Sequence, residues 1–420
     1  RSCPSFNTDL ASGLHKCNYA RGAVAYHPAL EAGVPAGGWC LCWRCKGACV
    51  LSGLKGWKLV CAGLALSSLL LAGCATVDEA SPQQGGGSGG GSQGAAQRIN
   101  GAGASFPAPF YSAVFQRFAQ EEGIEVNYQS IGSSGGREQF IQKTVAFGAS
   151  DEPMSEEEMR EAGGNPLHIA TVGGAVVPVY NIEGVDSGLN FTGRVLADIY
   201  LGNITRWNDP AIAELNPGVE LPDAKIAVVH RSDGSGTTNI WTSYLAAVSP
   251  EWKSGPGAGG EIKWPTGIGG DGNEGVAGLV KQTPNSIGYV GLEYAVQNEL
   301  AYGDVGEEGA FVRPSVESAR AAIAAAGDEI PEDLRFTISS ANPQGEGVYP
   351  ITGLTWILVR QQMDDPAQCR AVAQAAWYLT HEGQSLAPDL NYVPLPENIV
   401  SRDEELIRSM EAGGEKCYAG

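Results

Sequence analysis

The stretch HRSDGSGTT, residues 230–238, decides how the rest of the chain is interpreted. The apolar run 226–229 before it predicts a buried strand, and NIWTSYLAAV (239–248) after it carries apolar residues at helical spacing. A glycine-rich turn between strand and helix points several backbone N–H groups at one spot, at the positive end of the helix dipole. Arg231 adds a fixed positive charge, which Asp233 can hold in place. The stretch predicts an anion site, although Gly-Ser-Gly turns also cap ordinary helices.

The same pattern occurs twice upstream. GAGASFPAPFYSAVFQRF (101–118) places Ser105 before a helical run, and IGSSGGREQFIQKTV (131–145) does the same with Ser133 and Ser134. Three small, hydroxyl-bearing helix starts can converge on one small oxyanion. None has the Gly-Lys-Ser/Thr ending of a nucleotide-binding loop, which argues against a nucleoside triphosphate.

The charge is unevenly spread over the 420 residues, of which 43% are hydrophobic and whose net charge is −20. The length predicts two or three domains. Residues 1–73 carry seven Lys or Arg against two acids, a charge of +5, which leaves −25 for the remainder. Such an acidic body is a poor partner for nucleic acid or an anionic membrane surface. An anion must therefore be held by local dipoles and one or two cations.

The first 54 residues predict no domain, because they mix Gly, Pro, Cys and Trp without sustained periodicity. Four cysteines there lack the usual paired spacing of zinc ligands: Cys40, Cys42, Cys45 and Cys49. We expect residues 1–54 to be a leader outside the mature protein.

Residues 55–73 have the layout of a secretory signal, with two lysines before an apolar stretch that is too short for a comfortable membrane span. The ending LAGC (71–74) resembles the lipobox of bacterial lipoproteins, in which the cysteine, here Cys74, is acylated and becomes the mature N-terminus. A plain signal peptide with an incidental cysteine is the alternative. A lipidated Cys74 would anchor the protein without spanning the membrane. The Gly/Ser/Gln-rich stretch within 74–97 then predicts a flexible tether.

From Arg98 onward, strand patterns and helix patterns alternate, which predicts an α/β protein with mainly parallel sheets. Strands are predicted over 126–131, 145–150, 171–181 and 347–359, and a strand followed by a helix over 286–297. Helices are predicted over 156–162, over 196–216 with a break at 208–210, and over 367–384. Ser155 and Glu158 form a capping box for the first of these helices.

Only two cysteines, Cys369 and Cys417, lie beyond residue 74. In an exported protein they could form a disulfide, but their spacing does not exclude two free thiols.

Several motifs together resemble the phosphate-binding protein of the bacterial phosphate-specific ABC transporter. They are GAGASFPAP (101–109), GSSGG (132–136), FGASDEPMS (147–155), DIYLGNITRWND (198–209), DGSGTT (233–238), SIGYV (286–290) and YPITGLTWIL (349–358). The resemblance covers essentially all of 98–400 and none of 1–97. It implies a type II periplasmic binding protein fold, in which two α/β lobes are joined by two crossing hinge strands, here near 171–181 and 349–359. Lobe 1 would comprise 98–175 and 350–420, and lobe 2 would comprise 176–349.

The resemblance also implies a set of phosphate-binding residues. They are Ser105, the backbone N–H of Phe106, Ser133, Asp151, Arg231, Ser235, Gly236 and Thr237. Asp233 would support the site by pairing with Arg231. Asp151 would be the acceptor for the proton that phosphate carries and sulfate lacks, so that sulfate would leave two acceptors facing each other without a hydrogen. His230 is a departure, because relatives can have a second basic residue at that position.

The function implied is that of an extracytoplasmic phosphate receptor, periplasmic or at the cell surface, which hands phosphate to a membrane permease driven by an ATPase. We expect a monomer without catalytic residues, cofactor, metal or nucleic-acid partner, which meets the membrane through lipidated Cys74.

Two other classes of function compete with the receptor. Residues 132–136 also fit G-x-S-x-G, the nucleophile elbow of serine hydrolases, with Ser134 as nucleophile and His230 or His381 as base. No HGGG-type oxyanion motif accompanies it, and it leaves the other two serine-rich helix starts unexplained. A surface protein that keeps the fold for a structural role is the third possibility.

Overall fold

The structure is a computed structural model that describes residues 17–18, 24–25 and 97–418. The chain divides into two compact units, 1–88 and 89–420. In the first, strand β1 (Cys17–Asn18) pairs antiparallel with β2 (Val24–Ala25). The expected signal peptide, Cys74 and nearly all of the tether lie outside the described residues.

The second unit alternates strands and helices, as predicted. Its strands are β3 (Gln97–Gly103), β4 (Ile124–Ser130), β5 (Phe147–Ser150), β6 (Pro166–Asn181), β7 (Asn190–Phe191), β8 (Ala227–Arg231), β9 (Ile268–Gly270), β10 (Ser286–Gly291), β11 (Ala301–Tyr302), β12 (Asp304–Glu307), β13 (Ala310–Val312), β14 (Thr352–Arg360), β15 (Gln362–Met363), β16 (Glu411–Ala412) and β17 (Glu415–Lys416). Its α-helices are α1 (Ala108–Glu122), α2 (Ser133–Ile141), α3 (Glu156–Ala162), α4 (Gly193–Leu201), α5 (Pro210–Ala213), α6 (Gly236–Val248), α7 (Pro250–Ser254), α8 (Gly272–Gln282), α9 (Leu292–Gln297), α10 (Val316–Ala325), α11 (Pro366–Thr380) and α12 (Glu397–Ser409).

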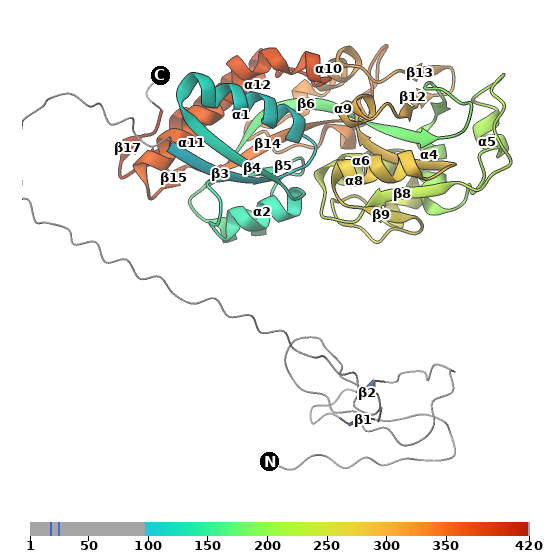
Figure 1. Cartoon of the computed structure of the whole chain (residues 1–420), viewed down its shortest axis with the longest axis horizontal. Coiled ribbons are helices and arrows are strands. Elements are labelled where there is room, and N and C mark those ends of the chain that lie inside the picture. The colour runs from blue at the N-terminus through green and yellow to red at the C-terminus, as the bar shows by residue number, and fades with distance from the viewer. Residues whose placement is uncertain (1–16, 19–23, 26–96, 419–420) are drawn as a thin grey trace, which may run out of the picture. The chain divides into compact units, whose positions relative to one another are not determined.

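The main sheet has nine strands in the order β4-β3-β5-β14-β6-β10-β8-β9, with β11 paired to β6 off this path. Around β4, β3 and β5 pack α1, α2 and α11, and around β10, β8 and β9 pack α6 and α8, so each end of the sheet forms an α/β lobe (Figure 1). The two long strands β6 and β14 pair with each other between the lobes. They are the crossing strands that the sequence placed near 171–181 and 349–359.

The expectation of mainly parallel sheets is wrong at the centre of this sheet. Strand β3 runs parallel to β4 and β5, and β8 runs parallel to β9 and β10. Strand β14, however, is antiparallel to both β5 and β6, and β6 is antiparallel to β10. The reason is the path of the chain, because β6 leads out of one lobe and β14 leads back into it.

Two predicted helices are shorter than expected. Helix α4 ends at Leu201 because Gly202 adopts a left-handed conformation with φ 82°, and α5 spans four residues only. Helix α11 ends at Thr380 and is followed by a 3-10 turn over Glu382–Leu386. The capping box of α3 is confirmed, with Ser155 and Glu158 each bonded to the other's backbone N–H.

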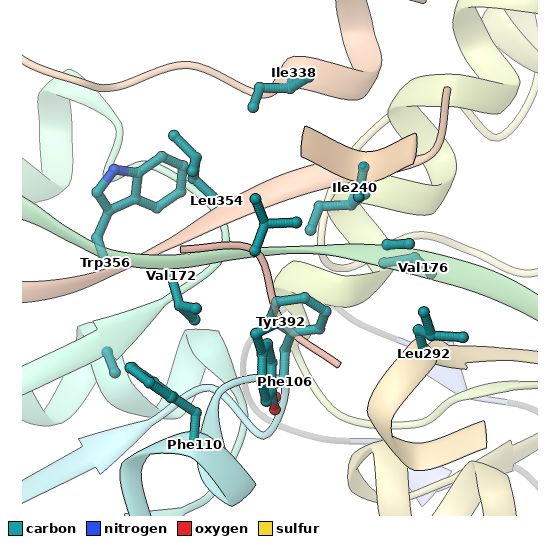
Figure 2. Packing of buried hydrophobic residues seen from close by; sticks show 14 of the residues in the cluster. Phe106, Phe110, Val172, Val176, Ile240, Leu292, Ile338, Leu354, Trp356 and Tyr392 are labelled. Atoms are coloured by element: carbon teal, nitrogen blue, oxygen red, sulfur yellow. The ribbon is translucent and has the colours of Figure 1, made fainter. Parts of the chain in front are cut away.

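The hydrophobic core continues across the hinge strands. Phe106 and Tyr392 lie together on one side of β6, while Leu354 and Trp356 lie on the other side (Figure 2). The rings of Phe106 and Tyr392 meet edge to face with centroids 5.7 Å apart. A Cβ at Gly174 would lie 2.7 Å from the Phe106 ring, so glycine lets this ring close on the strand.

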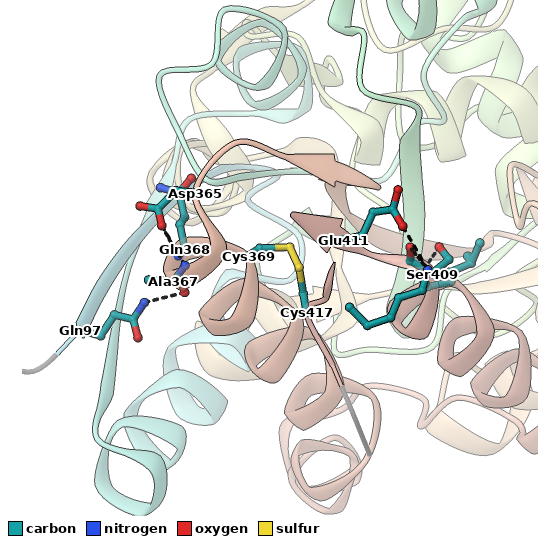
Figure 3. Close-up of a disulfide and its surroundings, with 10 residues drawn as sticks. Gln97, Asp365, Ala367, Gln368, Cys369, Ser409, Glu411 and Cys417 are labelled. Carbon is teal, nitrogen blue, oxygen red and sulfur yellow. Dashed lines mark hydrogen bonds and ion pairs between the residues drawn. A yellow bond between two sulfur atoms is a disulfide. The ribbon is translucent and has the colours of Figure 1, made fainter. Parts of the chain in front are cut away.

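Cys369 and Cys417 form a disulfide, which answers the question that their spacing left open. Figure 3 shows Cys369 on α11 joined to Cys417, which follows the small hairpin of β16 and β17. Because the two cysteines are 48 residues apart, the bond restricts a long loop of the unfolded chain.

We expect replacement of both cysteines, Cys369→Ser with Cys417→Ser, to lower the free energy of unfolding by about 2–4 kcal/mol, because the unfolded chain regains its loop entropy. Denaturant unfolding followed by tryptophan fluorescence measures the change. A reductant should lower the free energy of unfolding of the parent to that of the double variant. Equal stability of the parent and the double variant under oxidising conditions would contradict the stabilising role.

Candidate functional site

Three helix starts converge between the lobes, as the sequence predicts. Ser105 precedes α1, Ser133 opens α2, and Ser235 caps α6 by accepting a hydrogen bond from the N–H of Thr238. Asp151 follows directly after β5. Each of these residues is almost completely buried.

Three hydroxyl groups of the site already accept two hydrogen bonds each. Ser105 Oγ accepts from Asn273 N (3.1 Å) and Nδ2 (2.9 Å). Ser133 Oγ accepts from the N–H groups of Asp151 (3.2 Å) and Gly236 (2.9 Å). Thr237 Oγ1 accepts from Asn273 Nδ2 at 3.0 Å and, weakly, from Arg231 Nη1 at 3.5 Å. A hydroxyl has two lone pairs and one proton, so each group is left as a donor.

The site has a buried cation with a fixed orientation, Arg231. The Arg231 side chain is 1% exposed and pairs through Nε and Nη2 with the carboxylate of Asp233, as predicted. Burial alone would raise the pKa of Asp233, but the hydrogen bonds and charge of Arg231 outweigh it and hold that pKa below its usual value. The third nitrogen, Nη1, faces Thr237.

Asp151 supplies an acceptor among these donors. Burial raises the pKa of Asp151 to about 7, against the opposing effects of a hydrogen bond from Thr355 and the charges of Arg231 and Arg137. Oδ1 accepts from Thr355 Oγ1 at 2.8 Å. Oδ2 has no hydrogen-bond partner among residues 97–418, and neither has the N–H of Phe106.

The two lobes touch at the site. Ser134 N donates to Gly234 O at 3.1 Å, and Tyr294 Oη donates to Ser105 O at 2.7 Å. A Cβ at Gly236 would lie 2.7 Å from the Cα of Asp151, so glycine is needed there for this close approach. The structure therefore has its lobes closed on the circle of donors.

The nucleophile and the base of the alternative serine hydrolase are not brought together. Ser134 Oγ accepts from Arg137 Nη2 at 3.3 Å, and within residues 97–418 no histidine is hydrogen-bonded to it. The ring of His230 stacks on Trp264, and that of His381 stacks on Trp377. In the same described residues, no group of three or more His, Cys, Asp or Glu is placed to hold a metal ion.

Sequence reasoning missed two residues of the site, Asn273 and Thr355. Asn273 lies in GGDGN (269–273), a fourth glycine-rich helix start that the pattern used for the other three could have found. Its Oδ1 accepts from the N–H of Gly291 at 3.0 Å, which orients the amide so that Nδ2 faces the hydroxyls. Thr355 has no motif of its own, and its place follows from strand register.

Comparisons with known proteins agree with this fold. Residues 89–379 match the family model described as a PBP superfamily domain, which spans most of the chain, so the chain is a member of that superfamily. A phosphate-binding protein from Stenotrophomonas maltophilia has a solved structure with a TM-score of 0.58 at 19% identity, covering 74% of this chain and 94% of the other, which supports the fold alone.

Two relatives narrow the assignment from the superfamily to a family within it. Phosphate-binding protein PstS from Pasteurella multocida is 47% identical over 309 residues, 73% of this chain and 89% of the relative. The PstS protein from Haemophilus influenzae is 44% identical over 308 residues, 73% of this chain and 91% of the relative. The chain belongs to the PstS family of phosphate-binding proteins.

The pairing of Arg231 with Asp233 predicts a stability effect. We expect Asp233→Asn to lower the free energy of unfolding by about 2–4 kcal/mol, because it leaves a buried guanidinium without its carboxylate. Since the pKa of Asp233 is lowered in the folded protein, the difference from the parent should be complete above about pH 4 and shrink as the pH falls below that.

The exposed pair of Arg206 and Asp223 provides the control, because Asp223→Asn removes a carboxylate from a solvated ion pair. Urea unfolding at pH 7 and pH 3 measures both variants, and the control should lie within about 0.5 kcal/mol of the parent. Equal losses in the two variants would show that burial of Arg231 does not matter.

Proposed function

We propose that this protein binds inorganic phosphate between its lobes and delivers it to an ABC importer. The observation that carries the proposal is the set of three buried hydroxyls whose lone pairs are already filled. With the N–H of Phe106 and Nη1 of Arg231, these hydroxyls are donors around one open acceptor, Asp151 Oδ2. A small tetrahedral anion that carries a proton complements this arrangement.

Phosphate satisfies that pattern and sulfate does not. Near neutral pH phosphate keeps a proton that it can donate to an ionised Asp151, whereas sulfate presents only acceptors. A buried acceptor left without a donor can discriminate between such ligands by roughly 10⁴–10⁵. The body has an acidic surface overall, so selection rests on the local donors and not on attraction of any anion.

The proposed binding set is the one expected from sequence, with Asp233 as its support. It comprises Ser105, the N–H of Phe106, Ser133, Asp151, Arg231, Ser235, Gly236 and Thr237. Of these, Ser235 Oγ accepts one hydrogen bond, from the N–H of Thr238, which leaves its proton available to the anion. We place lobe 1 at 98–175 and 350–420 and lobe 2 at 176–349, close to where β6 and β14 cross between them.

Membership of the PstS family supports the transport role, because this family consists of substrate-binding transport proteins and not of enzymes. The protein would act outside the cytoplasm, as a monomer, and pass phosphate to the permease subunits of the transporter. Among the residues that the structure describes, no helix is both long and apolar enough to cross a membrane.

The variant Asp151→Asn tests whether Asp151 selects phosphate over sulfate. We expect the parent, stripped of ligand, to bind one phosphate and to reject sulfate at pH 8. The variant should lose about tenfold or more of its preference for phosphate, because an amide can donate a hydrogen bond to either anion. Isothermal titration calorimetry with each anion measures both affinities.

Asp389→Asn is the matched control, since Asp389 is an exposed aspartate outside the site. It should bind both anions as the parent does. A parent that binds neither anion would overturn the proposed function, and an Asp151→Asn variant that still rejects sulfate would remove Asp151 from the selection.

We also propose that Cys74 carries a lipid anchor, as LAGC (71–74) indicates. In a bacterial host, the parent should sediment with membranes and Cys74→Ser should not be lipidated, because the acylated thiol is lost. Mass spectrometry of the processed N-terminus together with fractionation measures this. Cys61→Ser, within the same signal, is the control and should remain anchored. A parent cleaved without lipid would contradict the proposal.

A further inference from the structure

Thr355 lies beside Asp151 because of the register of two strands. In the antiparallel pair of β5 and β14, Ser150 is opposite Trp356. One step beyond the end of β5 therefore places Asp151 opposite Thr355. The Thr355 hydroxyl, which is completely buried, donates to Asp151 Oδ1 at 2.8 Å.

We propose that Thr355 is a positioning residue that sets the selection between phosphate and sulfate, by holding Asp151 as an ionised acceptor with Oδ2 turned to the anion. The inference rests on the proposed function of the site. Thr355 would not touch phosphate itself. It acts because its proton occupies Oδ1, which leaves Oδ2 as the open lone-pair site of the carboxylate.

A β-bulge in β6 lies opposite Thr355. Strand β6 pairs Val172 with Thr355 and Ala170 with Trp356, so Thr171 is an extra residue between them. Thr171 Oγ1 donates to the Thr355 carbonyl at 3.3 Å. Because that proton is committed, the hydroxyl of Tyr111 is the donor in its 2.8 Å contact with Thr171.

The bulge is held in place by side chains of the C-terminal segment. Asp403 Oδ1 accepts from the N–H of Ala170 at 2.9 Å, and Gln384 Nε2 donates to the carbonyl of Thr171 at 2.7 Å. These bonds satisfy buried backbone groups at the bulge. The Thr355 hydroxyl therefore has a rigid support, and its acceptors are Asp151 Oδ1 and, weakly at 3.5 Å, the carbonyl of Ser150.

Several titratable groups face Asp151 from the elements around it. They are Tyr111 on α1, Tyr128 on β4, Arg137 on α2, Glu152 beside Asp151, Arg231 on β8, Glu293 and Tyr294 on α9, and Tyr392. Burial raises the pKa of Asp151 to about 7, and the hydrogen bond from Thr355 is the largest opposing effect. Loss of that bond should raise the pKa further, because it stabilises only the ionised carboxylate.

This sets the direction of the pH dependence. Above its raised pKa, Asp151 is ionised and rejects sulfate. Below it, the protonated carboxyl can donate a hydrogen bond to sulfate, so rejection of sulfate should weaken as the pH falls. Removal of the Thr355 hydroxyl should move this transition to higher pH by about one unit, which is a tenfold change in selectivity at a fixed pH.

The experiment measures phosphate and sulfate affinities by calorimetry from pH 5.5 to 8.5, on the full chain stripped of ligand. Thr355→Val removes the hydroxyl with little change of shape, and Thr355→Ser keeps it. Thr352→Val is the matched control, because Thr352 is a buried threonine of the same strand whose hydroxyl donates to Tyr349 O at 2.8 Å, away from Asp151.

We expect Thr355→Val to accept sulfate about tenfold better at pH 7.5 and to show a transition shifted upward by about one unit, with Thr355→Ser and Thr352→Val following the parent. An unshifted profile in Thr355→Val, or an equal shift in Thr352→Val, would overturn the inference. If either of these outcomes is found and the parent still binds phosphate selectively, the proposed function stands and only the role of Thr355 is overturned. A parent that binds no phosphate would overturn both.

Discussion

Three buried hydroxyls, of Ser105, Ser133 and Thr237, each accept two hydrogen bonds from N–H groups of the protein. Most of these N–H groups come from the lobe opposite the hydroxyl or from a segment distant in sequence. The protons of the hydroxyls are thereby directed into the space between the lobes. This arrangement can exist only when the lobes are closed, and a set of buried donors without an acceptor is costly. An anion bound between the lobes removes that cost.

The rest of the fold can be understood from this requirement. The long antiparallel strands β6 and β14 connect the lobes, while the parallel strands on either side place helix starts at one shared edge. Gly236 permits the closest approach across the site. Arg231 contributes a positive charge at the site. Because Asp233 pairs with it, the two side chains together do not attract anions in general. The selection is therefore local, in a body whose overall charge is strongly negative.

Much of the fold and of the candidate site could be predicted from the sequence, because short sequence motifs indicate both. The turn 230–238 and the serines at the starts of α1 and α2 identified the converging helix starts. A family resemblance supplied Asp151 and the hinge strands. Thr355 could not be found in this way, since its contact with Asp151 arises from the register of β5 and β14. The antiparallel centre of the sheet was missed for a related reason, because strand direction depends on the path between lobes and not on local pattern.

A crystal structure of the protein grown with phosphate tests the central claim most directly. The account predicts one phosphate enclosed by the three hydroxyls and Arg231, with one of its oxygens about 2.5–2.7 Å from Asp151 Oδ2, as expected for an O–H donor to a carboxylate. The Thr355 hydroxyl should remain on Oδ1. A phosphate bound elsewhere, or an Asp151 carboxylate turned away from the anion, would contradict it.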